Sequence, residues 1–310
     1  MKAQKWTMEQ MPGLEGRTAV VTGANSGLGF HTSKTLARKG ARVIMACRNL
    51  EKGQRARQMI METGADTEPE IWHLDLASLE SVKRFALKYE ESGYRLDLLI
   101  NNAGLMAIPY YRTEDGFEMQ FGVNHLGHFA LTARLWPRLV ESGPSRVVQL
   151  SSLAHYMGRI RFEDLNWERR YRKWRAYGMS KLANLLFIHE LSRRLRASGS
   201  RVLALAAHPG YADTELQAKG YRMKGDRLGA AFYQLANKLL AQTGEMGALP
   251  SLYAATAEGV DQGGFFGPGG VLRLHGFPAP DIPHGKLVND EVAERLCEVS
   301  ESLTGVEFRP

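Results

Sequence analysis

The chain has 310 residues, a formal net charge of +7 and only two cysteines, Cys47 and Cys297. Its 44% hydrophobic and 24% charged residues are ordinary for a globular protein, which excludes disordered and collagen-like chains. Two isolated cysteines give no disulfide framework and fit a reducing compartment. The basic residues are scattered apart from a run at 169–175, so we expect a solvated basic surface and not a nucleic-acid-binding protein.

Membrane and export signals are not expected. Residues 1–16 carry charge and proline but no apolar stretch of the length that a signal peptide or anchor needs. Later segments also fall short of a membrane-spanning length. We therefore predict a soluble, cytoplasmic protein.

Strands and helices are predicted to alternate from the start of the chain. Helical spacing predicts helices and short apolar runs predict strands. The strands are expected at 18–21, 42–46, 70–74, 96–100, 146–150 and 202–206, and the helices at 28–38, 51–62, 79–91, 116–140 and 177–196. This alternation predicts an α/β fold with a Rossmann-type, doubly wound sheet of about seven mostly parallel strands and helices on both faces.

One domain of residues 1–310 is expected, because α/β folds reach this length without splitting. Residues 16–210 would form the core, with a long polar connection at 154–175. Residues 211–244 are interpreted as a helical substrate lid and 263–310 as a C-terminal extension that ends in a short helix at 290–303.

A glycine-rich turn follows the first strand. Thr22 is followed by Gly23, Asn25, Ser26, Gly27, Leu28 and Gly29. Without Cβ atoms the backbone can turn sharply and approach a pyrophosphate, whose charge is favoured by the amino end of the next helix. These residues are therefore candidates for binding a dinucleotide cofactor.

The spacing TGxxxGxG resembles the short-chain dehydrogenase/reductase family. Asn102, Ala103 and Gly104 end an NNAG motif, Tyr177 and Lys181 form YxxxK, and Pro209 and Gly210 follow the last strand of the core. The resemblance spans residues 17–214 in family order and implies a nicotinamide cofactor. It adds Asp75, Leu76 and Thr214 to the cofactor-binding residues, although Asp75 could instead cap the following helix and Thr214 could cap a loop.

The end of the second strand bears on which dinucleotide is bound. NAD-preferring members of the family carry an acidic residue there, whereas this chain has Cys47, followed by Arg48 and Asn49. A guanidinium suits a 2′-phosphate, so we predict NADP(H). NAD(H) remains an alternative, because Ser26 stands where many NADP(H) members have a basic residue.

Tyr177 and Lys181 are four residues apart and would share one helix face. A nearby ammonium is expected to lower the pKa of the phenol and make it a usable acid/base. The resemblance assigns Ser152, with Ser151 as the alternative, to orient the substrate oxygen, and Asn124 to organise a water relay toward the lysine. Together these catalytic residues imply hydride transfer on CH–OH or C=O groups.

Ser152 and Tyr177 lie 25 residues apart, about twice the family's usual separation, so the stretch between them is unusually long. With residues 46–49, 123–129 and 180–187, this stretch resembles the retinol dehydrogenase and WW-domain oxidoreductase branch, and soluble bacterial oxidoreductases match best. The implied partner is a small, lipophilic carbonyl or alcohol, whose identity the sequence leaves open. The family also pairs helices equivalent to 116–140 and 177–196, so a homodimer or homotetramer is an expectation.

Two other functions compete with this interpretation. A sensor or scaffold that binds NADP(H) without turnover is the alternative, although both Tyr177 and Lys181 are present. An extended-branch isomerase or dehydratase is disfavoured by the glycine spacing. No metal is expected, because His125, His128, His155 and His208 match no ligand pattern.

Overall fold

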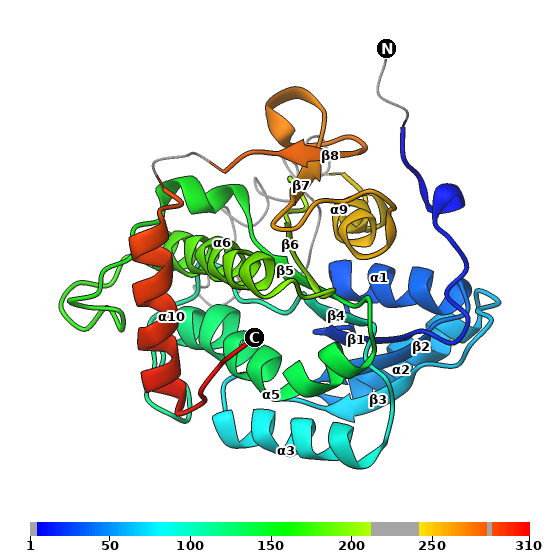
Figure 1. Cartoon of the computed structure of the whole chain (residues 1–310), viewed down its shortest axis with the longest axis horizontal. Coiled ribbons are helices and arrows are strands. Elements are labelled where there is room, and N and C mark those ends of the chain that lie inside the picture. Colours follow the sequence, from blue (N-terminus) through cyan, green and yellow to red (C-terminus); the bar gives the residue numbers. More distant parts are fainter. Residues whose placement is uncertain (1–4, 212–241, 284–286) are drawn as a thin grey trace, which may run out of the picture.

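The computed structural model describes residues 5–211, 242–283 and 287–310. They form one eight-stranded sheet with the order β3-β2-β1-β4-β5-β6-β7-β8 and helices on both faces (Figure 1). The strands are β1 (Thr18–Thr22), β2 (Arg42–Cys47), β3 (Glu70–His73), β4 (Leu98–Asn101), β5 (Arg146–Leu150), β6 (Leu203–Ala207), β7 (Phe265–Pro268) and β8 (Pro278–Asp281). The helices of more than one turn are α1 (Gly27–Arg38), α2 (Leu50–Met61), α3 (Leu79–Glu91), α5 (Gly127–Glu141), α6 (Lys173–Ser198), α9 (Gly244–Thr256) and α10 (Asp290–Thr304).

The predicted doubly wound sheet is confirmed. All neighbouring strands from β3 to β7 pair in parallel, with Val20 of β1 level with Ile44 of β2 and Leu99 of β4. The sheet has eight strands where about seven were expected. The extra antiparallel pairing of β8 with β7 lies in the stretch rich in glycine and proline, where no strand pattern is visible. Pro278 and Pro280 cannot donate ladder hydrogen bonds, so they suit the edge position of β8.

Three helical segments differ from expectation. The predicted helix 116–140 begins as the single turn α4 (Met119–Phe121) and continues through the π-helix Gly122–Leu126 into α5. Helix α6 begins at Lys173, within the connection expected at 154–175, and this connection also holds a short 3-10 helix, Leu153–Met157. The sequence did not predict α9, and most of the predicted lid at 211–244 lies outside the described residues.

Alternate side chains of the central strands enter two apolar layers. Val20 and Leu99 contact the layer formed with α3, α5 and α6, whereas Val21 and Ile100 belong to the layer under α1, α2 and α9. Both faces of the strands are therefore buried, which is typical of a parallel sheet covered by helices. No helix among the described residues has the length and apolar character needed to cross a membrane.

The C-terminal segment packs on the face that carries α5 and α6 (Figure 1). Ser300 Oγ of α10 lies 2.9 Å from Nε2 of the buried His125. Beyond α10, the ring of Phe308 makes edge contacts with Phe129 and Trp136 of α5. The end of the chain is thus part of the core on this face.

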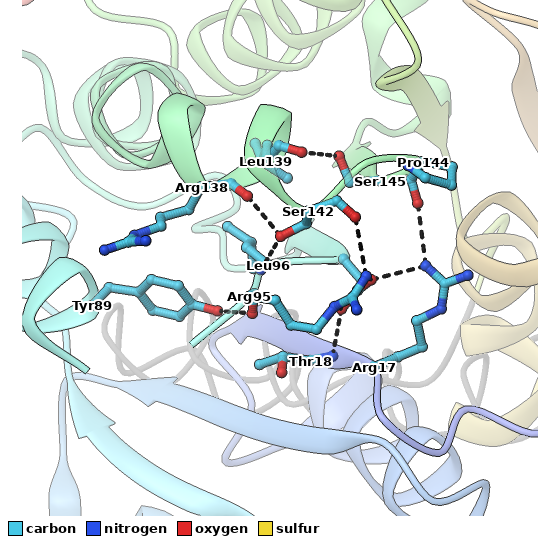
Figure 2. Close-up of polar contacts among 11 residues, drawn as sticks. Arg17, Thr18, Tyr89, Arg95, Leu96, Arg138, Leu139, Ser142, Pro144 and Ser145 are labelled. Carbon is cyan, nitrogen blue, oxygen red and sulfur yellow. Dashed lines mark hydrogen bonds and ion pairs between the residues drawn. The ribbon is translucent and has the colours of Figure 1, made fainter. Parts of the chain in front are cut away.

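A buried carboxylate joins the amino ends of the central strands. Asp97, whose side chain is 1% exposed, accepts a hydrogen bond from Thr18 N–H at 2.9 Å and two from the Arg95 guanidinium at 2.7 and 2.8 Å. Arg17 approaches the same carboxylate at 2.8 Å and also donates to the carbonyl oxygen of Pro144 (Figure 2). These contacts fix the starts of β1 and β4 and the turn before β5.

We expect Asp97→Asn to lower the free energy of unfolding by about 3 kcal/mol, because it removes the anion from two guanidinium groups and leaves a buried amide facing them. Urea unfolding followed by circular dichroism measures the change. The exposed Asp66→Asn is the matched control and should change stability by less than about 0.5 kcal/mol. An equal effect of both substitutions would remove the special role of Asp97.

Candidate active site

The residues singled out from the sequence lie at the carboxyl edge of the sheet. The glycine turn follows β1, the NNAG residues follow β4, Ser151 and Ser152 follow β5, and Pro209 follows β6. Because these strands are parallel, their carboxyl ends meet at one edge, and ligands of such sheets bind there.

Close packing holds the glycine turn against the NNAG segment. The Asn102 side-chain amide donates to the carbonyl oxygen of Thr22 at 2.8 Å, and Ala103 N–H donates to Thr22 Oγ1 at 2.9 Å. A Cβ at Gly29 would lie 2.4 Å from the carbonyl oxygen of Gly23 and 2.5 Å from Asn102 Nδ2. Glycine is therefore required at position 29 for α1 to approach this turn.

A cavity of about 320 Å³ opens between these segments. The amino end of α1 borders it, and Ser26 at that end makes no side-chain cap, so the first amides of the helix suit an anion such as a pyrophosphate. The predicted cofactor residues that line the cavity are Gly23, Asn25, Ser26, Gly27, Leu28, Arg48, Asn49, Asp75, Leu76, Asn102, Ala103 and Gly104. Among the other predicted cofactor residues, Gly29, Tyr177, Lys181, Pro209 and Gly210 do not line it, and Thr214 lies outside the described residues.

Sequence reasoning missed a second cation at this cavity. Lys52 lines the cavity with Arg48, and both side chains are exposed. Asn49 caps α2 by accepting a hydrogen bond from Lys52 N–H at 2.8 Å. A feature of the sequence could have revealed Lys52: it is a lysine in the first turn of a helix, where the helix dipole favours anions. Thr22, Ala46, Leu74, Leu105 and Val123 are further lining residues that were not singled out.

The end of β2 provides no acidic group. Cys47 is buried, and burial raises the pKa of its thiol to about 12, so it stays neutral. Asp75 lines the cavity, but its carboxylate also accepts a hydrogen bond from Ala77 N–H at 2.9 Å. The alternative that Asp75 caps the following helix is wrong, because Ser78 is the N-cap residue of α3 and the carboxylate of Asp75 contacts the turn before it.

Asn124 connects three parts of the site from within the π-helix. Its side chain accepts a hydrogen bond from Leu105 N–H at 2.7 Å and donates to the carbonyl oxygen of Leu105 at 2.9 Å. The same amide nitrogen lies 2.9 Å from Ser180 Oγ of α6. A Cβ at Gly104 would lie 3.2 Å from Asn124 Oδ1 and 3.4 Å from Lys181 Nζ, so these groups meet at the inner end of the NNAG segment.

Ser152 is close enough to Tyr177 to influence its phenol. Tyr177 is 8% exposed; burial raises the pKa of its phenol, and the Ser152 side chain acts to lower it. Ser151 points elsewhere, because its hydroxyl donates to the backbone carbonyl of Lys181 at 2.9 Å. The geometry therefore distinguishes the two serines and places Ser152 beside the tyrosine.

The expected effect of Lys181 on the pKa of Tyr177 is not found. Burial raises the pKa of Tyr177, and Lys181 is not among the groups that shift it. Lys181 Nζ donates to the carbonyl oxygen of Leu150 at 3.1 Å and lies 5.9 Å from the centre of the tyrosine ring. Burial also lowers the pKa of this lysine to about 8, so in most molecules its side chain still carries the proton at neutral pH.

Comparison with known proteins agrees with this arrangement. Residues 17–225 match the short chain dehydrogenase family. The chain belongs to this family.

The short-chain dehydrogenase is similar to retinol dehydrogenases over nearly its whole length. It is 46% identical to human retinol dehydrogenase 13 over 300 residues, which cover 95% of this chain and 86% of that protein. It is 41% identical to mouse retinol dehydrogenase 12 over 297 residues, which cover 95% and 88%. Its sequence thus falls in the retinol dehydrogenase-like branch.

Two solved structures share its fold. An uncharacterised protein from Mycobacterium paratuberculosis is 44% identical, with a TM-score of 0.81 and coverage of 98% of this chain and 99% of that one. The Pseudomonas aeruginosa RhlG/NADP active-site complex is 25% identical, with a TM-score of 0.63 and coverage of 82% and 94%.

The loop after β6 in this short-chain dehydrogenase is braced by the C-terminal extension. His208 Nδ1 accepts a hydrogen bond from Gly210 N–H at 3.1 Å, so Nε2 carries the proton that is donated to Asp281 Oδ2 of β8 at 2.7 Å. Gln242 donates to the carbonyl oxygen of Pro209 at 2.7 Å. The Pro209–Gly210 loop is therefore fixed from β8 and from the segment before α9.

The histidines of the dehydrogenase have structural contacts. Burial lowers the pKa of His125 and of His128 to about 3, and His128 lies 2.9 Å from Thr22 Oγ1 and 3.0 Å from the carbonyl oxygen of Asn124. His155 Nδ1 lies 2.7 Å from the carbonyl oxygen of Ser152, so this nitrogen carries the proton and donates the hydrogen bond. Within the described ranges no cluster of His, Cys, Asp and Glu is arranged for a metal ion.

We expect burial of Lys181 to make stability depend on pH between about 8 and 10. The folded pKa of about 8 lies below the ordinary value of 10.5, so in this window the unfolded chain binds more protons and stability rises with pH. Lys181→Met should remove this contribution. The free energy of unfolding of the native protein, minus that of the variant, should therefore increase by about 1 kcal/mol for each pH unit in this window. Urea unfolding at pH 7.5, 8.5 and 9.5 measures the difference, and parallel curves for the two proteins would contradict the assignment.

Proposed function

We propose that this short-chain dehydrogenase is an NADP(H)-dependent oxidoreductase that interconverts a lipophilic carbonyl compound and its alcohol. The observation that carries the proposal is the convergence of Ser152, Tyr177 and Lys181 at the carboxyl edge of the sheet, next to a cavity that suits a dinucleotide. A catalytically silent cofactor sensor would not need these three side chains together.

Each residue has a distinct part in the proposed reaction. When bound, the nicotinamide would supply or accept the hydride. In the reduction direction the Tyr177 hydroxyl gives its proton to the substrate oxygen, and Ser152 donates a hydrogen bond to the same oxygen. Lys181, in its charged form, stabilises the tyrosinate that this leaves, and Asn124 holds the lysine side of the site in place through Leu105 and Ser180.

The raised pKa of Tyr177 fits the acid of this scheme. A buried, protonated phenol is ready to give a proton, but it needs help to stabilise the anion that results. We infer that Lys181, whose ammonium lies 5.9 Å from the centre of the tyrosine ring, supplies this stabilisation.

The lipophilic substrate class rests on the retinol dehydrogenase-like relatives, because the retinol of their names is a lipophilic alcohol. The cofactor preference rests on Arg48 and Lys52 at the cavity and on neutral Cys47 in place of an acidic residue. The similar RhlG structure contains NADP, which agrees with this preference. A cytoplasmic location stays a prediction from the two unpaired cysteines.

We expect Tyr177→Phe to lower kcat for NADPH oxidation by about three orders of magnitude, because the substrate oxygen loses its proton donor. A panel of aldehydes and ketones, retinal included, followed by NADPH absorbance, measures the loss. NADPH binding, followed by its fluorescence, should change little.

Two serine variants provide the comparison. Ser152→Ala should lower kcat by about one hundredfold, because it removes a hydrogen bond to the reacting oxygen. Ser151→Ala removes only the bond to the Lys181 backbone and should affect stability more than kcat. Turnover unchanged in Tyr177→Phe would exclude the mechanism, and tight NADPH binding without turnover of any compound would favour the sensor.

Cofactor preference can be tested at Arg48. We expect Arg48→Ser to raise KM for NADPH about tenfold and to leave KM for NADH nearly unchanged, because only NADPH carries the 2′-phosphate. Arg55→Ser, an exposed arginine of α2 that does not line the cavity, is the control. Equal effects of Arg48→Ser on both cofactors would rule out its selective role.

A further inference from the structure

A second cavity lies in the segment between the candidate catalytic serine and tyrosine. It has a volume of about 380 Å³ and is formed by part of the connection 154–172 and the first turn of α6. We call it the arginine pocket. Its lining residues are Arg159, Arg161, Arg170, Arg172, Arg175, Glu163, Met157 and Trp167.

The positive charge of the arginine pocket is mostly uncompensated. Arg161 lies 3.7 Å from Glu163 and 3.6 Å from Asp164. Within residues 5–211, 242–283 and 287–310, the other four arginines of the pocket have no ion pair. Like charges gathered around one cavity repel one another, and a bound anion would relieve this repulsion.

The amino end of α6 adds to this positive potential. Arg172 is the N-cap residue, no side chain caps the helix, and the first turn contains no acidic residue. Helix dipoles favour anions at this end, and natural helices usually place Asp or Glu there. Arg172 and Arg175 are cations at the position where an anionic ligand is most stabilised.

One residue in the wall of the pocket, Trp167, has an unfavourable backbone conformation. Trp167 has φ of +54°, which is unfavourable for a bulky residue, and its ring is nevertheless buried. The Arg161 guanidinium lies over this ring at 4.7 Å from the centre, and the carboxylate of the buried Asp164 accepts a hydrogen bond from Glu168 N–H at 2.7 Å. The indole N–H has no hydrogen-bond partner among the described residues. Strain held by such contacts is typical of functional sites.

We propose that the arginine pocket binds a phosphoryl group. Several guanidinium groups around one cavity match an oxyanion with more than one charge, since each can donate two parallel hydrogen bonds to its oxygens. The cavity is of the size that accommodates small ligands. The phosphoryl group belongs either to a soluble phosphorylated compound or to a phospholipid headgroup, and exposed Tyr156, Met157 and Trp174 nearby would contact an attached apolar chain.

The site is separate from the cofactor cavity, with which it shares no lining residue. It lies close to the candidate catalytic tyrosine, because Arg175 is two positions before Tyr177 and Trp174 is in ring contact with Tyr177. The proposal does not depend on the oxidoreductase activity, and its test needs no turnover.

Pyrophosphate is the probe for the soluble source. Isothermal titration should show binding to the native protein that weakens at least about tenfold in the double variant Arg170→Gln/Arg172→Gln, because two exposed cations of the pocket are lost. Arg169→Gln is the matched control, since Arg169 is exposed in the same run but does not line the pocket. Pyrophosphate that enters the cofactor cavity would bind all three proteins equally.

Vesicles distinguish the lipid source. A phospholipid headgroup would be assigned if the native protein and Arg169→Gln co-sediment with phosphatidylglycerol vesicles but not with phosphatidylcholine vesicles. The double variant should then co-sediment with neither. Pyrophosphate binding with no vesicle binding would assign a soluble ligand. A second pair, Arg159→Gln/Arg175→Gln, repeats the measurement in case the first pair unfolds. Equal binding of both probes by control and pocket variants, or no binding at all, would overturn the proposal.

Discussion

The geometry of the candidate active site depends on one side-chain amide. The Asn124 side chain accepts a hydrogen bond from the N–H of Leu105 and donates one to its carbonyl oxygen. The NNAG segment therefore cannot move independently of the helix that carries the asparagine. Its contact with Ser180 extends this coupling to α6, one residue before Lys181. The π-helix at Gly122–Leu126 accompanies this arrangement, and such wide turns are frequent at functional sites. Packing alone would hold the elements together, but the amide sets their relative positions.

The amino and carboxyl ends of the strands contribute differently to stability. At the amino ends, the buried carboxylate of Asp97 is surrounded by donors, and its contacts tie β1, β4 and the start of β5 together. At the carboxyl ends, Lys181 is buried where desolvation disfavours its charge. The first arrangement stabilises the fold, and the second costs stability.

Much of this structure could be predicted from the sequence. The six core strands were predicted within one or two residues of their observed bounds, because each is an apolar run closed by glycine or polar residues. The glycine turn, the NNAG residues, Asn124, Tyr177 and Lys181 were found by motif spacing, and the structure brings them to one edge of the sheet. Strands β7 and β8 were missed, because their glycine and proline residues interrupt the local strand pattern. These strands are recognised only by their pairing within the sheet.

Other properties depend on tertiary contacts that no local pattern contains. Spacing alone suggested that Lys181 lowers the pKa of Tyr177, but burial raises the pKa of the phenol, and Lys181 instead donates a hydrogen bond to the carbonyl oxygen of Leu150. The basic run at 169–175 was predicted to be a solvated surface, and Arg170, Arg172 and Arg175 are indeed exposed. Its arginines gather with Arg159 and Arg161 only because the connection folds back on α6.

The position of α10 bears on how this chain could assemble. The sequence analysis expected assembly through helices 116–140 and 177–196, and α10 and Phe308 cover one face of the corresponding helices α5 and α6 (Figure 1). The chain thus covers that face with its own last helix. A twofold complex through that surface would require the tail to swing out, whereas an assembly that leaves it in place must use another face.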